Sequence, residues 1–317
     1  MKLDYLRISI TDRCDFNCVY CRPQERVKLL DHDEVLRFEQ IARFVQLLVP
    51  WGLERVRITG GEPLVRRGIT GLVKMVSEID AIQDISMTTN GNSLVSHARL
   101  LKEAGLSRIN VSLDSLREKA FAAITGRAQL SNVLAGIEQA LLVGLVPIKT
   151  NTVVLRGVNE EDVVDIVRFS NGRGIVPRFI EYMPFNSVGE TRWYVSNEET
   201  RGQIEEAFGS LVPASVPGGG PAEYLQNRSG SIVVGFISPI SCPFCQSCSR
   251  LRLGADGKLK PCLVSDRSYD AKLLLESDGS EQQMKELMQQ VIEYKKVRCG
   301  SSPEFENSQT VMFRVGG

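Results

Sequence analysis

Residues 11–21 read TDRCDFNCVYC and carry three cysteines, Cys14, Cys18 and Cys21, on one short segment after an apparent first strand. A 4Fe-4S cluster is normally closed by four cysteine thiolates. Three thiolates on one loop would therefore leave one iron open to a chelating small molecule. The segment is the first candidate active-site element.

A structural zinc loop is the alternative interpretation of these cysteines. Zinc sites are usually built from Cys-x2-4-Cys pairs and take a fourth Cys or His. The chain contains only two histidines, His32 and His97, and neither sits at ligand spacing. The Cys-x3-Cys-x2-Cys spacing, with Tyr20 before the last cysteine, resembles the radical S-adenosylmethionine (SAM) superfamily, which we favour over zinc.

The composition is that of a chain that can bury a large core. Its 317 residues, 43% of them hydrophobic, suit one large domain with an extension, or two domains. No stretch approaches the roughly 18 consecutive apolar residues of a membrane span, and the N-terminus lacks a signal-peptide pattern, so we expect a cytoplasmic protein. Because 38 Lys and Arg balance 38 Asp and Glu, no overall field favours nucleic acid or membranes.

Short β-rich segments alternate with helical patterns along the first two thirds of the chain. The predicted strands cover residues 6–10, 55–59, 84–89, 108–113, 147–154 and 178–183. Such alternation predicts a parallel sheet, and polar motifs after the strands suit the carboxyl-terminal rim of a barrel. We therefore predict a partial (β/α)6 TIM-like barrel with a C-terminal iron–sulfur extension; a doubly wound sheet is the alternative.

The alternation fades after residue 184, and the Pro- and Gly-rich stretch 212–221 reads as a surface loop. We place the domain boundary there, with a radical SAM core at 1–215 and a C-terminal domain for an auxiliary cluster and substrate at 216–317. The second part is expected to contain a hairpin around residues 232–237 and a helix over 281–294.

Residues 57–63, RITGGEP, follow the second predicted strand. Gly60 and Gly61 let the backbone approach a ligand closely, and Glu62 offers a charged acceptor. Alone this could be an ordinary turn, but beside the cysteine loop it resembles the radical SAM turn that holds the amino group of SAM. Ser112, after the fourth strand, is a candidate partner for the SAM carboxylate or ribose.

A second cysteine group has the spacing Cys-x2-Cys-x13-Cys and consists of Cys245, Cys248 and Cys262. It again offers three ligands and no obvious fourth. A zinc ribbon is the alternative, because Cys242 could complete four sulfurs. Repetition of the three-ligand arrangement favours a second cluster with an open iron.

Together these motifs resemble the GTP 3′,8-cyclase family of molybdenum cofactor biosynthesis over nearly the whole chain. The family combines the Cys-x3-Cys-x2-Cys loop and Gly-Gly-Glu-Pro with Phe-Cys-x-x-Cys-x-Arg-x-Arg, a later Pro-Cys-Leu and a terminal Gly-Gly. Residues 244–252, 261–263 and 316–317 match these elements. Ser249 and Arg22 depart from residues common in the family, and Cys242 and Cys299 are additional, but no expected ligand is lost.

The resemblance implies two 4Fe-4S clusters and SAM as cofactors. It assigns SAM binding to Tyr20, Gly61, Glu62, Ser112 and Met183. It assigns GTP binding to Arg7, Arg57, Thr88, Lys149, Arg250 and Arg252, with Arg55 and Arg178 as further basic positions and catalytic roles for Arg178, Arg250 and Arg252. Such residues suit a triphosphate, because Arg forks bind phosphate bidentately and Lys acts as a point charge.

The reaction implied by the resemblance begins with reductive cleavage of SAM to methionine and a 5′-deoxyadenosyl radical. The radical would take hydrogen from C3′ of GTP, and the ribose radical would attack guanine C8 to give (8S)-3′,8-cyclo-7,8-dihydroguanosine 5′-triphosphate. The second cluster would bind the purine, and Gly316-Gly317 would enter the pocket. An external electron donor, a homodimer and transfer of the product to cyclic pyranopterin monophosphate synthase are implied as well.

Two other classes are weighed against this interpretation. A peptide-modifying radical SAM enzyme with auxiliary clusters usually carries more C-terminal cysteines. A noncatalytic iron–sulfur sensor has no reason to combine Gly-Gly-Glu-Pro with a rim of basic residues.

Overall fold

The structure, a computed structural model, describes residues 3–21, 28–185, 191–245, 248–265, 267–276, 281–298 and 312–315. Its helices are α1 (Phe38–Leu48), α2 (Ile69–Ser77), α3 (Leu94–Glu103), α4 (Glu118–Thr125), α5 (Leu130–Leu142), α6 (Val163–Ser170), α7 (Asn197–Phe208), α8 (Lys272–Glu276), α9 (Glu281–Arg298) and α10 (Met312–Val315). Its strands are β1 (Tyr5–Ser9), β2 (Arg55–Thr59), β3 (Asp84–Thr89), β4 (Arg108–Ser112), β5 (Ile148–Val154), β6 (Ile175–Glu181), β7 (Leu211–Pro213), β8 (Glu223–Asn227), β9 (Val233–Ile237), β10 (Arg250–Leu253), β11 (Lys258–Lys260) and β12 (Tyr269–Asp270).

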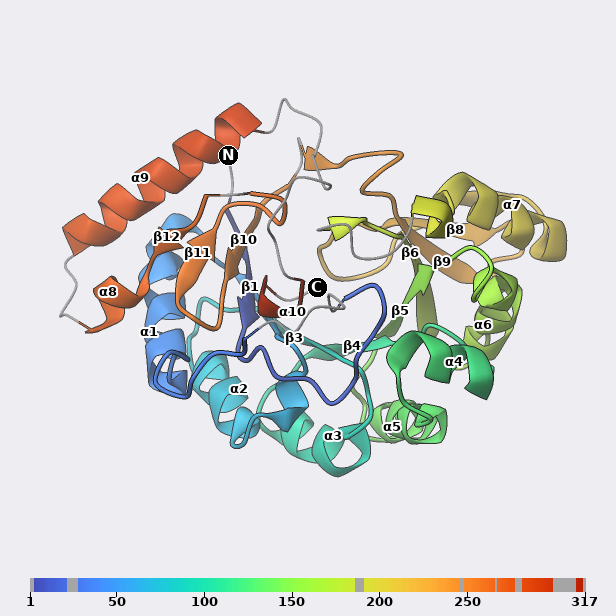
Figure 1. Ribbon diagram of the computed structural model, residues 1–317, viewed down its shortest axis with the longest axis horizontal. Helices are drawn as coiled ribbons and strands as arrows, with labels where there is room; N and C mark the ends of the chain where they lie inside the picture. The colour runs from blue at the N-terminus through green and yellow to red at the C-terminus, as the bar shows by residue number, and fades with distance from the viewer. Residues whose placement is uncertain are drawn as a thin grey trace.

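Six parallel strands form the centre of the molecule. β1 to β6 lie side by side in chain order, and every neighbouring pair is parallel. The sheet curves into an open wall with α1 to α6 around its convex side (Figure 1). In α1 the buried residues Ile41, Phe44, Val45 and Leu48 recur at helical spacing, which explains why this helix covers the sheet. The predicted partial (β/α)6 barrel is confirmed.

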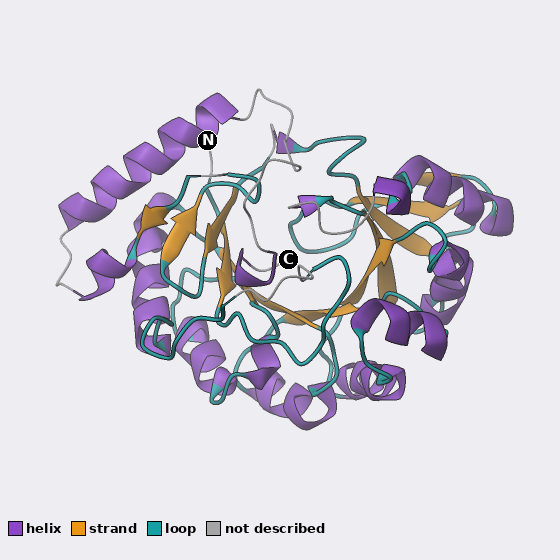
Figure 2. Cartoon of the chain, viewed as in Figure 1, coloured by secondary structure: helices purple, strands orange, loops and turns teal. Residues whose placement is uncertain are grey.

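Strands from the C-terminal part extend the same sheet on both flanks (Figure 2). β10 lies parallel to β1, with Tyr5 opposite Arg250 and Arg7 opposite Arg252. On the other flank β9 lies parallel to β6 and antiparallel to β8, which confirms the expected hairpin. The boundary placed after residue 215 falls between β7 and β8, so the chain beyond it remains part of the continuous sheet.

The two cysteine groups lie at opposite ends of the barrel. Cys14, Cys18 and Cys21 follow β1, at the carboxyl-terminal end of the parallel strands. Cys248 precedes β10, which is parallel to β1, and Cys262 follows β11, which is antiparallel to β10. This topology places the second group at the amino-terminal end of the same strands. Among the described residues, no helix has the length and hydrophobicity needed to cross a membrane.

Candidate active site

The first cysteine loop packs Cys14 and Cys18 against the main hydrophobic core. The Phe16 amide donates a hydrogen bond to Cys14 Sγ at 3.4 Å, and Asn90 Nδ2 approaches the same sulfur at 4.0 Å. Donors directed at a sulfur stabilise its thiolate form, which is the form that binds iron. These half-buried, unbridged cysteines therefore fit a cluster bound by three thiolates. Among the described residues, no three His, Cys, Asp or Glu side chains converge as ligands of a single metal ion.

Glu62 is buried between this loop and β3, with a relative exposure of 1%. Its carboxylate accepts hydrogen bonds from Asn90 N (2.6 Å), Thr89 Oγ1 (2.7 Å) and Leu64 N (3.0 Å). Burial raises the pKa of Glu62 to about 7, although these bonds favour the charged form. A buried carboxylate held in this way is suited to receive a cationic group.

Tyr20 connects the cysteine loop to the end of β4. Its hydroxyl donates a 2.6 Å hydrogen bond to Asp114 Oδ2, and Asp114 Oδ1 accepts from Val153 N at 2.9 Å. Burial raises the pKa of Asp114 to about 6. Ser112 ends β4 two residues earlier, and Met183 follows β6 at the same end of the barrel. The structure thus brings the predicted SAM-binding residues to one rim.

Gly61 lies where two segments of backbone nearly touch. A Cβ at this position would lie 2.3 Å from the carbonyl oxygen of Arg13, and the Gly61 amide donates a 2.6 Å bond to Thr11 O. Because the obstacle is backbone rather than a flexible side chain, it cannot move without displacing the cysteine loop. Only glycine fits here.

Gly61→Ala is therefore expected to lower the free energy of unfolding by about 1–3 kcal/mol, as overpacking does. Gly71→Ala is the matched control, because nothing lies within 4 Å of a Cβ there and α2 should gain about 0.5–1 kcal/mol. Denaturant titration of both variants measures the difference. Equal stability of the two would mean that the contact relaxes without cost.

The second cysteine group opens into a cavity inside the barrel. The described residues that line it include all three cysteines of that group and Met183 of the first rim, so the cavity reaches from one end toward the other. Cys242 is exposed and does not line it. The fit is therefore to Cys245, Cys248 and Cys262 rather than to a set that includes Cys242.

Positive charge is concentrated around Cys248. Arg250 Nε lies 3.4 Å and Lys295 Nζ 3.6 Å from Cys248 Sγ. Burial alone would raise the pKa of the Cys248 thiol, but the charges of Arg250 and Lys295 outweigh it and hold this pKa at about 6. The sulfur is therefore prepared to act as a thiolate ligand.

Arginine side chains form a layer in the middle of the barrel; four of them are buried and Arg250 is half-buried. Arg7, Arg57, Arg178, Arg250 and Arg252 line the cavity, and no Asp or Glu is found among the described residues that line it. Burial, together with repulsion between neighbouring guanidinium groups, lowers the pKa of Arg178 and of Arg252 to about 10, so both remain charged at neutral pH. The buried atoms Arg57 Nη2 and Arg178 Nε have no hydrogen-bond partner among the described residues. Such an array is built for an anion.

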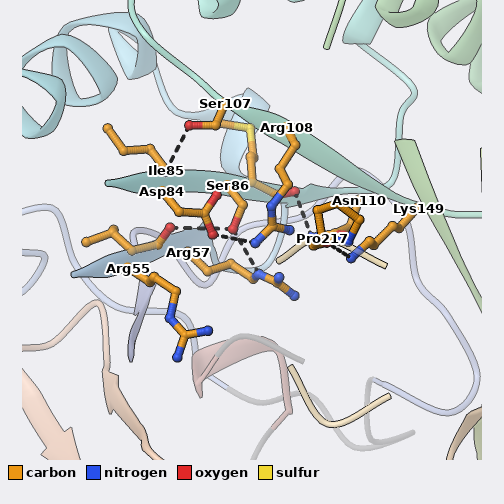
Figure 3. Close-up of polar contacts among 12 residues, drawn as sticks. Arg55, Arg57, Asp84, Ile85, Ser86, Ser107, Arg108, Asn110, Lys149 and Pro217 are labelled. Atoms are coloured by element: carbon orange, nitrogen blue, oxygen red, sulfur yellow. Dashed lines mark hydrogen bonds and ion pairs between the residues drawn. The ribbon is translucent and has the colours of Figure 1, made fainter. Parts of the chain in front are cut away.

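Carboxylates neutralise two arginines of the neighbouring strands that stand outside this layer. Arg108 pairs with Asp84 at 2.5 Å, and Arg55 pairs with Asp4 at 2.7 Å. Figure 3 shows Arg108 with its partner, whereas Arg57 of the cavity donates a 3.2 Å hydrogen bond to the neutral Ser86 hydroxyl. Arg55, predicted as a basic position of the pocket, does not line the cavity.

Lys149 also differs from its predicted place. Its side chain is buried, and Nζ donates a 2.7 Å hydrogen bond to the Pro217 carbonyl (Figure 3) and lies 5.0 Å from the centre of the Tyr224 ring. Burial and the neighbouring arginines lower the pKa of Lys149 to about 7. Lys149 is therefore turned to the 214–222 loop and does not line the cavity.

Sequence reasoning missed several residues of both sites. Asn90 and Asn92 hold Asp15 at 2.6 and 2.7 Å, and Lys295 contacts Cys248 from α9. Met312 of α10 lines the cavity, while the predicted tail residues Gly316-Gly317 lie outside the described residues, as do Arg22 and Cys299. Only Lys295 had a usable signal, because it continues the helical spacing of the apolar residues Met284, Met288 and Val291.

Two family models match the chain, the Radical SAM superfamily over residues 8–170 and Molybdenum Cofactor Synthesis C over residues 175–300. Among solved structures, SuiB of Streptococcus suis bound to S-adenosylmethionine aligns with a TM-score of 0.64 at 15% identity, covering 90% of this chain and 68% of that one. That likeness shows the fold. Fold and site together define a radical SAM enzyme, whose cofactors are 4Fe-4S clusters and SAM.

Curated relatives identify the family within this class. A GTP 3′,8-cyclase of Thermodesulfovibrio yellowstonii is 43% identical, covering 92% of each chain. One of Pelotomaculum thermopropionicum is 45% identical over 93% of this chain and 91% of that one, and one of Heliobacterium modesticaldum is 43% identical over 99% and 98%. The chain belongs to the GTP 3′,8-cyclase family, which acts in molybdenum cofactor biosynthesis.

Proposed function

We propose that this chain converts GTP into (8S)-3′,8-cyclo-7,8-dihydroguanosine 5′-triphosphate in the cavity between its two cysteine groups. The observation that carries the proposal is the cavity itself. Three cysteines and five arginines line it, and no carboxylate of the described residues does. A polyanion with one metal-binding end fits this lining better than a peptide or a neutral molecule.

Each cysteine group has its own ligand set in this proposal. Cys14, Cys18 and Cys21 hold the first 4Fe-4S cluster, and Cys245, Cys248 and Cys262 hold the second. When bound, the first cluster and SAM supply a one-electron reduction that yields a hydrogen-abstracting radical. Glu62 and the Gly61 backbone hold the SAM ammonium group, while Tyr20, Ser112 and Met183 complete its pocket.

The basic layer positions the nucleotide between the two ends. Arg7, Arg57 and Arg178 project from β1, β2 and β6 and bind the triphosphate, with Thr88 beside them. Arg250 and Arg252 flank the second cysteine group and compensate negative charge there. Lys149 binds the triphosphate only if its Nζ gives up the hydrogen bond to the Pro217 carbonyl oxygen. Fixing the ribose relative to the first rim is the main contribution that such a cavity makes.

The test uses the anaerobically reconstituted protein with reductant, SAM and GTP deuterated at C3′. Mass spectrometry of the 5′-deoxyadenosine formed measures hydrogen transfer. Deuterium in this product supports the proposal. Cleavage of SAM without deuterium transfer would reject hydrogen abstraction from C3′ of GTP. Absence of SAM cleavage with intact clusters would reject the proposal that the first rim binds and cleaves SAM.

The affinity for SAM is expected to fall as the pH drops through about 7. The pKa of Glu62 is raised to about 7, so below this pH the carboxyl becomes neutral and no longer attracts the ammonium group. Equilibrium dialysis of SAM with the cluster-loaded protein, between about pH 6 and pH 8, measures the effect. Glu62→Gln should bind SAM weakly at both ends of this pH range. A pH dependence of SAM binding that survives this substitution would assign the titration to another group.

The partners, the oligomeric state and the location are proposed from family membership alone. We propose an external electron donor, a homodimer, transfer of the product to cyclic pyranopterin monophosphate synthase, and a cytoplasmic location. The division into a radical SAM core and a C-terminal part that carries the auxiliary cluster is likewise a proposal.

A further inference from the structure

We propose that Lys295 is a positioning residue for the second cluster, which holds together the two segments that supply its cysteines and sets its reduction potential. The inference rests on the proposed ligand set Cys245, Cys248 and Cys262. Lys295 belongs to α9, far along the chain from these cysteines. Its role follows from three contacts, its burial and the absence of a competing carboxylate among the described residues that line the cavity.

Lys295 bridges the two halves of the cysteine group. Its Nζ lies 3.6 Å from Cys248 Sγ and donates 3.0 Å hydrogen bonds to the carbonyl oxygens of Arg250 and Pro261. Arg250 begins the strand that follows Cys248, and Pro261 immediately precedes Cys262. One ammonium group therefore ties the Cys248 segment to the Cys262 segment, whose spacing a cluster must fit.

The same three contacts separate Lys295 from the substrate-binding cations. An ammonium group has three N–H donors, and these three acceptors take all of them. Although Lys295 lines the cavity, no donor is left for a nucleotide. Arg57 and Arg178, in contrast, keep buried donor atoms without partners among the described residues.

The spacing of the apolar residues along α9 explains why Lys295 lies at this point. Met284, Met288 and Val291 are buried in the main core and are spaced by four and three residues, and Lys295 follows after four more. All four lie on one face of α9. A lysine that is only 3% exposed at the end of an apolar stripe needs negative charge nearby, because burying an uncompensated cation is costly.

The second cluster would provide that negative charge. Three thiolates give a cluster of this type a net negative charge, and hydrogen bonds and nearby charge at the sulfurs set its reduction potential. A cation next to Cys248 stabilises the reduced state, which carries one more negative charge. Removal of the cation should therefore lower the potential.

The experiment compares Lys295→Met, Lys295→Arg and Lys296→Met in a Cys18→Ala background that retains only the second cluster. Lys296 is the matched control, because it is the next residue of α9 and is exposed. Redox titration followed by electron paramagnetic resonance gives the midpoint potential, and exposure to a chelator gives the rate of iron loss. Lys295→Met should show a lower potential and faster iron loss, Lys296→Met neither, and Lys295→Arg a potential closer to that of the parent.

Each other outcome has a defined meaning. Equal potentials and equal iron loss in Lys295→Met and Lys296→Met would overturn the inference. A Lys295→Met variant that folds by circular dichroism but loads no second cluster would support it. General unfolding of both Lys295 variants would show a role in the fold and overturn it. A Cys18→Ala parent without a second cluster would show that the second site does not load independently of the first, and would overturn the inference that its own cysteines and Lys295 hold this cluster.

Discussion

Cys18→Ala is expected to abolish cleavage of SAM, whereas Cys262→Ala is expected to leave that cleavage intact and abolish conversion of GTP. The reason is geometric, because the two cysteine groups lie at opposite ends of the parallel strands. Loss of either cluster should not dismantle the other. Iron analysis should give about four iron atoms per chain in each variant, against about eight in the parent protein.

Cys242→Ala is the control for this pair. Cys242 is exposed and does not line the cavity, so its removal should leave iron content and both activities unchanged. The rate of 5′-deoxyadenosine formation and chromatography of the nucleotide product measure the two activities. Loss of the second cluster in Cys242→Ala would mean that Cys242 is a ligand of the second site, as in the four-sulfur, zinc-ribbon-like alternative. Loss of all iron in either ligand variant would contradict two independent sites.

The barrel could be predicted because its strands are defined by local patterns. The apolar residues of β1 to β5 mark strands whose observed bounds differ from the predicted ones by one residue at most. β6 begins three residues before its predicted start, because Ile175 pairs with Ile148 of β5, which the local sequence does not show. Parallel strands are buried on both faces, so their composition is distinctive.

The flanking strands could not be predicted, because pairing across the chain defines them. β10 has four residues and alternates Arg with Leu, and it becomes a strand by lying next to β1, more than 200 residues earlier. The pairing also explains the basic layer. Arg7 and Arg252 are opposite each other in this register, although nothing in their local sequence links them.

The site residues divide in the same way. The cysteines, Gly61 and Glu62 belong to motifs with fixed spacing, so the local sequence alone makes them candidates. Lys149 is different, because its bond to the Pro217 carbonyl depends on a loop that the sequence marks only as rich in Pro and Gly. The carboxylate partners of the arginines, such as Asp4 for Arg55, could not be predicted either, because the fold brings together residues that are far apart in the sequence.

Arg252→Ala is expected to weaken GTP binding roughly 10- to 150-fold, as the loss of a hydrogen bond to a charged group does, and to leave SAM cleavage in place. Arg252 is 6% exposed, lines the cavity beside Cys262 and remains charged at neutral pH, because its pKa stays at about 10 despite burial and the repulsion of Arg250. Equilibrium dialysis with GTP measures the affinity, and 5′-deoxyadenosine formation measures SAM cleavage.

Two further variants decide whether position in the cavity or simple charge number controls this affinity. Lys258→Ala removes an exposed cation from β11, the strand beside Arg252, and should leave GTP binding unchanged. Arg55→Ala removes a cation that Asp4 already neutralises outside the cavity, so its effect should be smaller than that of Arg252→Ala. Equal losses in Arg55→Ala and Arg252→Ala would show that the carboxylate pairs do not separate substrate-binding arginines from structural ones. A loss confined to Arg252→Ala would mean that an arginine contributes to GTP binding only where it lines the cavity, and that arginines paired with Asp4 and Asp84 serve the fold.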